Sequence, residues 1–292
     1  MDYNKQYDFY LSIVENEIKC AFNSLKNVPD LLKDAMEYAV IGGGKRVRPV
    51  LCFAVAENLG VDLNKIKEFA FAIECIHSYS LVHDDLPAMD NDDYRRGKLS
   101  THKKFGEAYG ILAGDALLNF AFEYCLNKID FDKKDALALK LLAEYAGASG
   151  MIAGQVLDLQ NEKNNLPNEK ILYDIYINKT AKLLTAPLLI ASIAADNKYF
   201  NELKEFGLNL GAMFQISDDI MDVEGSLEEI GKTPNKDSGV DKLTSIKVFG
   251  LDGAKARLKE HYNKCLDILN KINANSFLKE FTEKMYLRKK WD

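Results

Sequence analysis

Residues 62–90 read DLNKIKEFAFAIECIHSYSLVHDDLPAMD, an apolar stretch that ends in acidic residues. Seven of its apolar residues recur at spacings of three and four, with one spacing of five, which is close to the period of one helix face. They are Leu63, Ile66, Phe69, Ala70, Ile73, Ile76 and Leu81. The pattern predicts one long helix over 62–85, which ends near Pro87 because proline has no N–H group to continue the helix.

On both sides of this helix, similar periodicity predicts helices in most of the chain. The expected ranges are about 4–26, 30–41, 47–59, 106–127, 134–161, 168–195, 199–224, 252–271 and 275–289. The chain has 18 Gly and 6 Pro in 292 residues, and so few helix breakers favour long helices over a turn-rich β fold. Segments 42–44, 90–101 and 225–243 are expected to be loops. The sequence therefore predicts an all-α protein, and no linker divides residues 1–292.

Composition narrows the function classes. A net charge of −6 argues against nonspecific nucleic-acid binding. The five cysteines are odd in number and widely spaced, which predicts reduced core thiols in a cytoplasmic protein. The N-terminus lacks the apolar run of a signal peptide. The most apolar stretch, 183–195, is shorter than the roughly 20 residues of a membrane span, so no span is expected.

The first acidic cluster places five carboxylates within residues 84–93. Asp84 and Asp85 fall at the C-terminal end of the predicted helix, where the helix dipole disfavours negative charge. A compensating cation is therefore expected, and Pro87 allows Asp90 to fold back towards Asp84. A solvated acidic turn is the alternative interpretation. A calcium-binding EF-hand loop is excluded because arginine stands where that loop requires glycine.

The second acidic cluster has the i, i+3, i+4, i+7 spacing of one helix face. Its members are Gln215, Asp218, Asp219 and Asp222. Such a stripe is either a solvent-exposed face or the wall of an internal polar site. No basic residue stands four positions away to relieve the carboxylates, which favours a metal site, and the first cation that follows is Lys232.

The basic segment GGGKRVRP at 42–49 has the chemistry of a phosphate-binding loop. Its glycines let the backbone approach an oxyanion, while Lys45 and Arg48 supply charged donors. The spacing is not that of a Walker loop. A glycine-rich helix end followed by surface charge is the alternative.

Polar residues also interrupt other apolar helices. Lys179 and Thr180 interrupt one predicted helix, and Gln155 and Asp158 interrupt another. For Gln155 and Asp158 a buried structural hydrogen bond is expected. His77 alone would be read as a core or rim histidine, and no arrangement of His, Ser and Cys suggests a nucleophilic triad.

These elements, in this order, resemble the trans-prenyltransferases, the short-chain isoprenyl diphosphate synthases. The matching segments are GGKRVRP (43–49), HSYSLVHDDLPAMDNDDYRRG (77–97), AGDALL (113–118), GQ (154–155), KT (179–180), QISDDIMD (215–222) and GKTP (231–234). The resemblance implies a single polyprenyl synthetase domain over 1–292. It also implies a helical bundle around a deep central cavity, the isoprenoid synthase fold, and a homodimer.

The resemblance further implies Mg²⁺ as cofactor, with three ions expected when diphosphate is bound. Asp84, Asp85 and Asp90 would be ligands for two ions, and Asp218 and Asp222 for the third. The catalytic set would combine metal ligands with two lysines. It comprises Asp84, Asp85, Asp90, Lys179, Asp218 and Lys232.

Two diphosphate subsites follow from the same resemblance. The allylic diphosphate would contact Arg95, Lys179, Thr180, Gln215, Lys232 and Lys242. Isopentenyl diphosphate would contact Lys45, Arg48, His77 and Arg96. In the family, the loop that carries Lys232 and Lys242 closes over the site.

The expected reaction is head-to-tail condensation of isopentenyl diphosphate with dimethylallyl or geranyl diphosphate. Tyr79 and Ser80 precede Asp84 by about one helical turn, and the bulky Tyr79 would form the floor that sets product length. With the insertion that contains Pro87, this resembles the bacterial farnesyl diphosphate synthase type. The alternative is a geranylgeranyl or longer-chain synthase. A noncatalytic subunit is disfavoured because both acidic motifs are present, and a terpene cyclase is disfavoured by the second set of diphosphate-binding cations.

Overall fold

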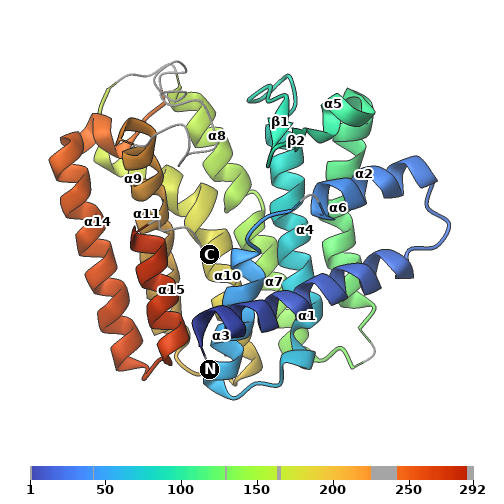
Figure 1. The fold of residues 1–292 in the computed structure, drawn as a ribbon, viewed down its shortest axis with the longest axis horizontal. Coiled ribbons are helices and arrows are strands. Elements are labelled where there is room, and N and C mark those ends of the chain that lie inside the picture. The colour runs from blue at the N-terminus through green and yellow to red at the C-terminus, as the bar shows by residue number, and fades with distance from the viewer. Residues whose placement is uncertain (1, 42, 129, 163–165, 225–241, 288–292) are drawn as a thin grey trace. The chain divides into compact units, whose positions relative to one another are not determined.

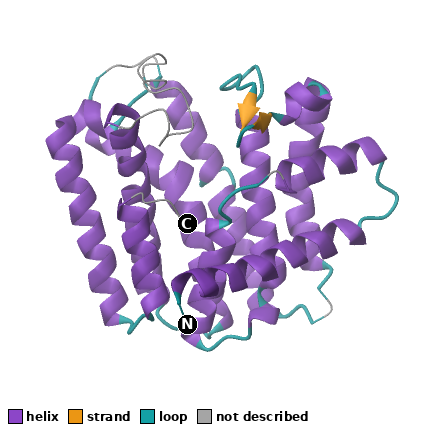
Figure 2. Ribbon diagram, in the orientation of Figure 1, coloured by secondary structure: helices purple, strands orange, loops and turns teal. Residues whose placement is uncertain are grey.

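The computed structural model describes residues 2–41, 43–128, 130–162, 166–224 and 242–287. Helices make up most of this part of the chain, and one short two-stranded hairpin is the only sheet in it (Figure 2). The all-α prediction is confirmed. Residue contacts divide the chain into two compact units, 1–139 with 193–195 and 140–192 with 196–292, which are described separately.

The first unit holds the N-terminal helices and the hairpin (Figure 1). Its elements are α1 (Tyr3–Ser24), α2 (Asp30–Ile41), α3 (Val47–Leu59), the 3-10 turn η1 (Leu63–Lys65), α4 (Lys67–Asp84), β1 (Tyr94–Arg95), β2 (Lys98–Leu99), α5 (Thr101–Phe105) and α6 (Glu107–Leu126). Helix α7 (Lys133–Ala146) begins in this unit and continues into the second.

Helix α4 is the central helix of the first unit, and it packs against α1, α2, α3 and α6. Residues 69–76 are all buried, so every face of this part of the helix is covered. Helix α6 approaches α4 closely because residue 114 is glycine: a Cβ there would lie 2.1 Å from Nε2 of His83. Helix α4 is therefore a core helix, and its last residue is Asp84.

The second unit contains the C-terminal helices. Its elements are α8 (Met151–Asn161), α9 (Glu169–Ile175), the π-helical turn η2 (Tyr176–Ala181), α10 (Lys182–Ala194, whose last two residues belong to the first unit), α11 (Phe200–Glu224), α14 (Ser245–Lys271) and α15 (Ser276–Leu287). Helix α11 packs against α14, α15 and η2, and α8 packs against η2. Glycines bring η2 close to both of its neighbours.

The two glycines that contact η2 are Gly154 on α8 and Gly211 on α11. A Cβ on Gly154 would lie 2.1 Å from the backbone N of Lys179, and one on Gly211 would lie 2.3 Å from Cβ of Ala181. No larger residue fits at either position without moving a helix, so these glycines set the place of Lys179 and Thr180.

Several sequence-based boundaries are wrong. The helix predicted over 134–161 is two helices, because 147–150 form a turn between α7 and α8. The loop predicted over 90–101 contains the β1–β2 hairpin, in which Tyr94 pairs with Leu99. The helix expected over 252–271 starts earlier, at Ser245, with a break at Gly250 (φ 69°). Of the five cysteines, Cys20 is exposed, and only the other four are core residues.

One stretch of the described residues, Lys133–Asn161, is long and apolar enough by composition to cross a membrane. The turn at 147–150 interrupts it, so neither α7 nor α8 alone reaches the roughly 20 residues that a span needs.

Candidate functional site

The first acidic cluster folds back onto the end of α4, as predicted. The backbone N of Asp90 donates to the carbonyl O of Asp84 (2.8 Å), and that of Asp92 donates to the O of Asp85 (3.2 Å). These bonds satisfy carbonyls that the helix end would otherwise leave without donors. The carboxyl groups of Asp84 and Asp90, both half-buried, are thereby carried on adjacent backbone segments.

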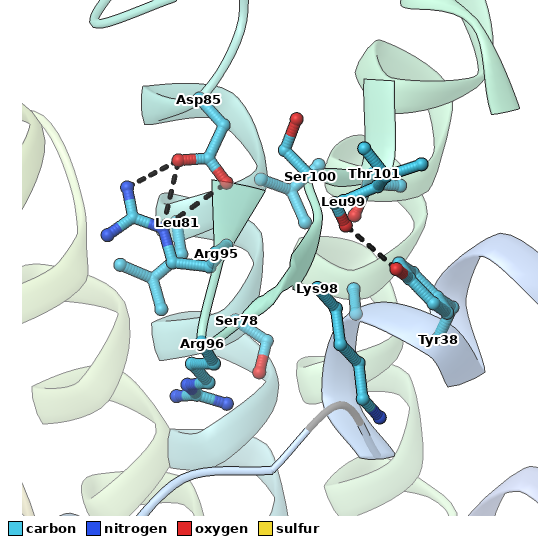
Figure 3. Close-up of a pocket in the computed structure, with 12 residues that line it drawn as sticks. Tyr38, Ser78, Leu81, Asp85, Arg95, Arg96, Lys98, Leu99, Ser100 and Thr101 are labelled. Atoms are coloured by element: carbon cyan, nitrogen blue, oxygen red, sulfur yellow. Dashed lines mark hydrogen bonds and ion pairs between the residues drawn. The ribbon is translucent and has the colours of Figure 1, made fainter. Parts of the chain in front are cut away.

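Asp85 is held by Arg95 of the hairpin rather than by solvent (Figure 3). Nε of Arg95 donates to Oδ1 of Asp85 at 2.9 Å, and Nη2 donates to the same carboxylate, so the pair is bidentate. Asp85 is 2% exposed. Burial raises its pKa, and Arg95 opposes that shift. A small pocket of about 30 Å³ lies beside this pair, with Ser78 and Leu99 in its wall.

The glycine-rich loop before α3 is fixed by a buried arginine that the sequence analysis left without a role. Arg46 is 3% exposed and has a left-handed backbone (φ 48°). Its Nη1 donates to Glu74 of α4 (2.8 Å), its Nε to Glu15 of α1 (2.9 Å) and its Nη2 to the O of Val40 (2.7 Å). The side chain therefore ties the loop to three helices and positions its neighbours Lys45 and Arg48.

Arg48, Arg96 and His77 form a cationic cluster next to this loop. Gly44 has a positive φ of 123°, and a Cβ there would lie 2.6 Å from Cζ of Arg96. Nη1 of Arg96 donates to the carbonyl O of Gly43. Nε of Arg48 is buried and makes no hydrogen bond among the described residues.

The electrostatics of the cluster point to an anion. The pKa of Arg48 is lowered to about 10, chiefly by burial; the charge of Glu74 raises it and that of Arg96 lowers it. Burial and the charges of Arg48 and Arg96 hold the pKa of His77 well below its usual value, so His77 is neutral at pH 7. Like charges that depress one another's pKa values are relieved when an anion binds between them.

Tyr79 lies on α4, buried, with 5% of its surface exposed. Its hydroxyl makes no hydrogen bond among the described residues, and its ring contacts that of His83 edge to face, with centroids 5.9 Å apart. Ser80 instead turns its hydroxyl back to the O of His77 (2.8 Å). Of the two residues predicted to set the length of the product, Tyr79 is therefore the one with the bulky side chain.

In the second unit, η2 carries the predicted pair Lys179 and Thr180. Nζ of Lys179 donates to Oδ2 of Asp158 (2.6 Å), and Oγ1 of Thr180 donates to Oε1 of Gln215 (2.9 Å). The structural hydrogen bond expected of Asp158 is confirmed, and its partner is a predicted site residue. A π-helical turn at this point fits the frequent occurrence of such turns at functional sites.

The carboxylates of α11 have different surroundings. Asp219 accepts hydrogen bonds from Ser245 at the start of α14 and from the hydroxyl of Tyr176 in η2. Asp218 and Asp222 are half-buried on the same helix. The stripe is thus neither a fully solvent-exposed face nor a fully buried one.

The predicted residues divide between the two units. Those of the first unit are Lys45, Arg48, His77, Tyr79, Ser80, Asp84, Asp85, Asp90, Arg95 and Arg96. Those of the second unit are Lys179, Thr180, Gln215, Asp218, Asp222 and Lys242. The prediction for Lys232 falls outside the described residues.

Sequence reasoning gave no role to Glu74, Arg46, Tyr176 or Ser245. Their partners lie far away in the sequence: Arg46 and Glu74 are 28 residues apart, and Tyr176 and Asp219 are 43 apart. The one signal in the sequence was Glu74 within the apolar run 69–76, because a charge buried in such a run needs a partner.

The donor set fits Mg²⁺ bound together with a substrate. Within the described ranges, no three His, Cys, Asp or Glu side chains converge into a ready-made metal cage. Mg²⁺ commonly uses one or two carboxylates and completes its coordination with water and substrate phosphates. The carboxylates of Asp84 and Asp90, carried on backbone segments joined by a hydrogen bond, match that mode.

Comparison with known proteins agrees with this geometry. A family model described as polyprenyl synthetase matches residues 29–283. Farnesyl diphosphate synthase of Micrococcus luteus is 44% identical over 82% of this chain and 83% of its own length. A chloroplastic geranylgeranyl pyrophosphate synthase of Capsicum annuum is 43% identical over 78% of this chain and 63% of its own length.

A solved structure has the same fold. The geranyltransferase of Helicobacter pylori, complexed with magnesium and isoprenyl diphosphate, is 33% identical, with a TM-score of 0.82 over 97% of each chain. The shared fold, the matched residues and the acidic and cationic clusters agree, and this chain belongs to the polyprenyl synthetase family.

Proposed function

We propose that this protein is a magnesium-dependent prenyltransferase that condenses isopentenyl diphosphate with dimethylallyl or geranyl diphosphate. The products are farnesyl diphosphate and free diphosphate. One observation carries the proposal: in one unit, the cationic cluster of Arg48, Arg96 and neutral His77 accompanies an acidic α4 terminus. The first attracts an anion directly, and the second attracts an anion that arrives with metal.

Two diphosphates require these two kinds of subsite. Lys45, Arg48 and Arg96 would bind isopentenyl diphosphate by charge-assisted hydrogen bonds. His77 would add a hydrogen bond without taking a proton from the ligand. Gly44 supports this assignment, because its lack of a side chain lets Arg96 lie against the loop.

The allylic diphosphate would be bound by Asp84, Asp85, Asp90, Asp218 and Asp222 with three magnesium ions. Bound Mg²⁺ supplies Lewis-acid stabilisation of the charge that develops on the departing diphosphate. Among the described residues Arg95, Lys179, Thr180, Gln215 and Lys242 are proposed contacts of the same group, and Lys232 is proposed from the resemblance alone.

The chemistry of the chain's own groups follows from electrostatics. When the C1–O bond of the allylic substrate breaks, Lys179 and Arg95 stabilise the negative charge that appears on the diphosphate. The double bond of isopentenyl diphosphate then attacks C1, and a new C–C bond forms. A proton leaves C2 of the former isopentenyl unit for the released diphosphate, so no protein base is needed.

Product length is assigned from Tyr79. Its buried ring, about one turn before Asp84, supports a floor for a C15 chain. A geranylgeranyl product is the second candidate, because synthases named for that product also match this chain.

We also propose a cytoplasmic homodimer. Helix α6 supports it, because Tyr109, Ile111 and Leu112 are 41%, 46% and 52% exposed along one stretch. Exposed apolar residues gathered in this way are typical of an interface. Light scattering of the purified protein is expected to give twice the chain mass, and Leu112→Glu is expected to shift it towards the monomer.

The activity is tested by diphosphate release. Purified protein with isopentenyl diphosphate, geranyl diphosphate and Mg²⁺ is expected to release diphosphate, and EDTA is expected to abolish the release. Omitting either isoprenoid is the control. Release that needs no isopentenyl diphosphate would indicate hydrolysis or cyclisation and would overturn the proposal.

A further inference from the structure

Asp219 stands beside Asp218 in the second acidic cluster, yet the structure gives it protein partners. Its Oδ2 accepts from the backbone N of Ser245 (2.6 Å), from Oγ of Ser245 (2.8 Å) and from the hydroxyl of Tyr176. A carboxylate oxygen has about two lone pairs for acceptance. Three donors therefore fill Oδ2.

The donors are themselves fixed in place. Ser245 is fully buried and Tyr176 is 4% exposed. Burial and the charge of Asp219 raise the pKa of Tyr176 well above its usual value, so its hydroxyl keeps the proton that it donates. The backbone N of Ser245 also donates to the Tyr176 hydroxyl (3.0 Å), so Asp219, Tyr176 and Ser245 form one hydrogen-bond network.

The network lies where α14 begins. Leu243 is buried in the same apolar cluster as Tyr176, Ile216 and Ile220. Thr244 caps α14, because its Oγ1 accepts from the backbone N of Lys247 (3.3 Å). The packing of Leu243 and the cap of Thr244 therefore hold the start of α14 in place, and Asp219 adds hydrogen bonds that connect it to α11.

The consequence concerns Lys242, three residues before Ser245. Three residues of extended chain span at most about 11 Å. While Ser245 is bonded to Asp219, Lys242 stays in the neighbourhood of α11 and its carboxylates. A cation close to Asp218 would help to hold a diphosphate there.

We propose that Asp219 is a positioning residue rather than a metal ligand: it ties the start of α14 to α11 and thereby keeps Lys242 beside the second acidic cluster. This role deepens the proposed function and, in its kinetic part, rests on it. Asp219 acts through Ser245 and Lys242 and does not itself contact the substrate.

The tie is tested first without metal or substrate. Asp219→Asn, Ser245→Ala and the double variant are compared with the wild type by thermal unfolding in EDTA. Each single variant is expected to lower Tm by about 2–4 °C for each hydrogen bond weakened, and the double variant is expected to lose little more than one single variant. Asp218→Asn combined with Ser245→Ala is the matched control and is expected to give additive losses.

The positioning role is tested by kinetics. Ser245→Ala and Asp219→Asn are both expected to raise KM for geranyl diphosphate about tenfold, the factor that corresponds to one hydrogen bond to a charged group. The Mg²⁺ concentration for half-maximal rate is expected to stay within about twofold, whereas Asp218→Asn is expected to raise it.

Two results would overturn the proposal. One is an additive Tm loss in the Asp219–Ser245 cycle. The other is a raised Mg²⁺ requirement in Asp219→Asn with an unchanged KM in Ser245→Ala, which would make Asp219 a metal ligand. If the wild type shows no turnover, the proposed function fails, and the metal-free cycle still decides whether the tie exists.

Discussion

Arg46 has a left-handed backbone that non-glycine residues seldom adopt, and its ion pairs with buried Glu74 and partly exposed Glu15 hold it there. The side chains of Arg46 and Glu74 are each 1% exposed. Removing one member of a buried pair leaves an uncompensated charge, which costs far more than losing a surface pair. Arg46 therefore explains how a glycine-rich loop stays ordered enough to present Lys45 and Arg48.

The residue-level prediction for this pair is quantitative. Arg46→Ala is expected to lower the free energy of unfolding by about 3–5 kcal/mol, measured by urea denaturation. Lys33→Ala removes a partly exposed ion pair with Glu37 and is expected to cost less than about 0.5 kcal/mol. A loss for Arg46→Ala as small as that of Lys33→Ala would show that the buried pair contributes no stability.

Tyr79 gives a prediction for specificity. Tyr79→Ala is expected to shift the product from C15 towards C20 and longer, because it removes the ring that would close the chain's path. Ser80→Ala is the control: its hydroxyl is turned back to His77, so product length is expected to remain that of the wild type. Chromatography of dephosphorylated products is the measurement, and an unchanged Tyr79→Ala profile would refute the floor.

At the scale of elements, the π-helical turn η2 depends on close packing with α8 and α11. Both contacts are made through a glycine, Gly154 on α8 and Gly211 on α11. The position of Lys179 therefore depends on the absence of a side chain at these two residues. A helix that approaches this closely has no room to adjust to an added methyl group.

Gly154→Ala tests that dependence. The added Cβ would lie 2.1 Å from the backbone N of Lys179, so α8 and η2 must separate. We expect a loss of about 1–3 kcal/mol in the free energy of unfolding and a raised KM for the allylic diphosphate. Ile152→Ala on the same helix, at a residue that is 44% exposed, is expected to change neither.

Elements with a long, regular period were predictable from the sequence. Helix α4 ends at Asp84, within one residue of the predicted end at 85, because Pro87 limits it. Its predicted start at 62 is wrong: the helix begins at Lys67, and residues 63–65 form the separate turn η1. The break at 147–150 was missed because the apolar pattern continues through it. The hairpin was missed because two residues per strand carry no period.

The candidate site was predictable in part for the same physical reason. Local motifs identified Asp84, Lys179 and Gln215, and the structure pairs Lys179 and Gln215 with polar partners. The residues that support the site could not be predicted, because the bond between Arg46 and Glu74 joins the glycine-rich loop to a helix 28 residues away. The sequence also could not show which carboxylate of α11 accepts hydrogen bonds from the protein. That depends on a tertiary contact, here the one between Ser245 and Asp219.

At the scale of the whole molecule, neutral histidines couple stability to pH. The two ring nitrogens of His261 form hydrogen bonds with Tyr173 and Asn209. Burial of this side chain lowers its pKa to about 4. His77 in the first unit is shifted in the same direction. An unfolded histidine titrates near 6.5. The unfolded state therefore takes up protons first as pH falls, and stability is lost from about pH 6.5 down to about pH 4.

His261→Gln isolates this contribution. The shift corresponds to about 3 kcal/mol at most, present in full above pH 6.5 and absent below pH 4. Between pH 7.5 and 4.5 the variant is expected to lose less free energy of unfolding than the wild type, as measured by denaturation at each pH. Parallel curves for the two proteins would contradict the assignment.

This chain is proposed to extend an allylic diphosphate by isopentenyl units and to stop at C15. The most direct test is mass spectrometry of the product made from ¹³C-labelled isopentenyl diphosphate with Mg²⁺. A C15 product with two labelled units from dimethylallyl diphosphate, and with one from geranyl diphosphate, is the predicted result. Three labelled units from dimethylallyl diphosphate would contradict the C15 assignment, and no incorporation from either primer would contradict prenyl transfer itself.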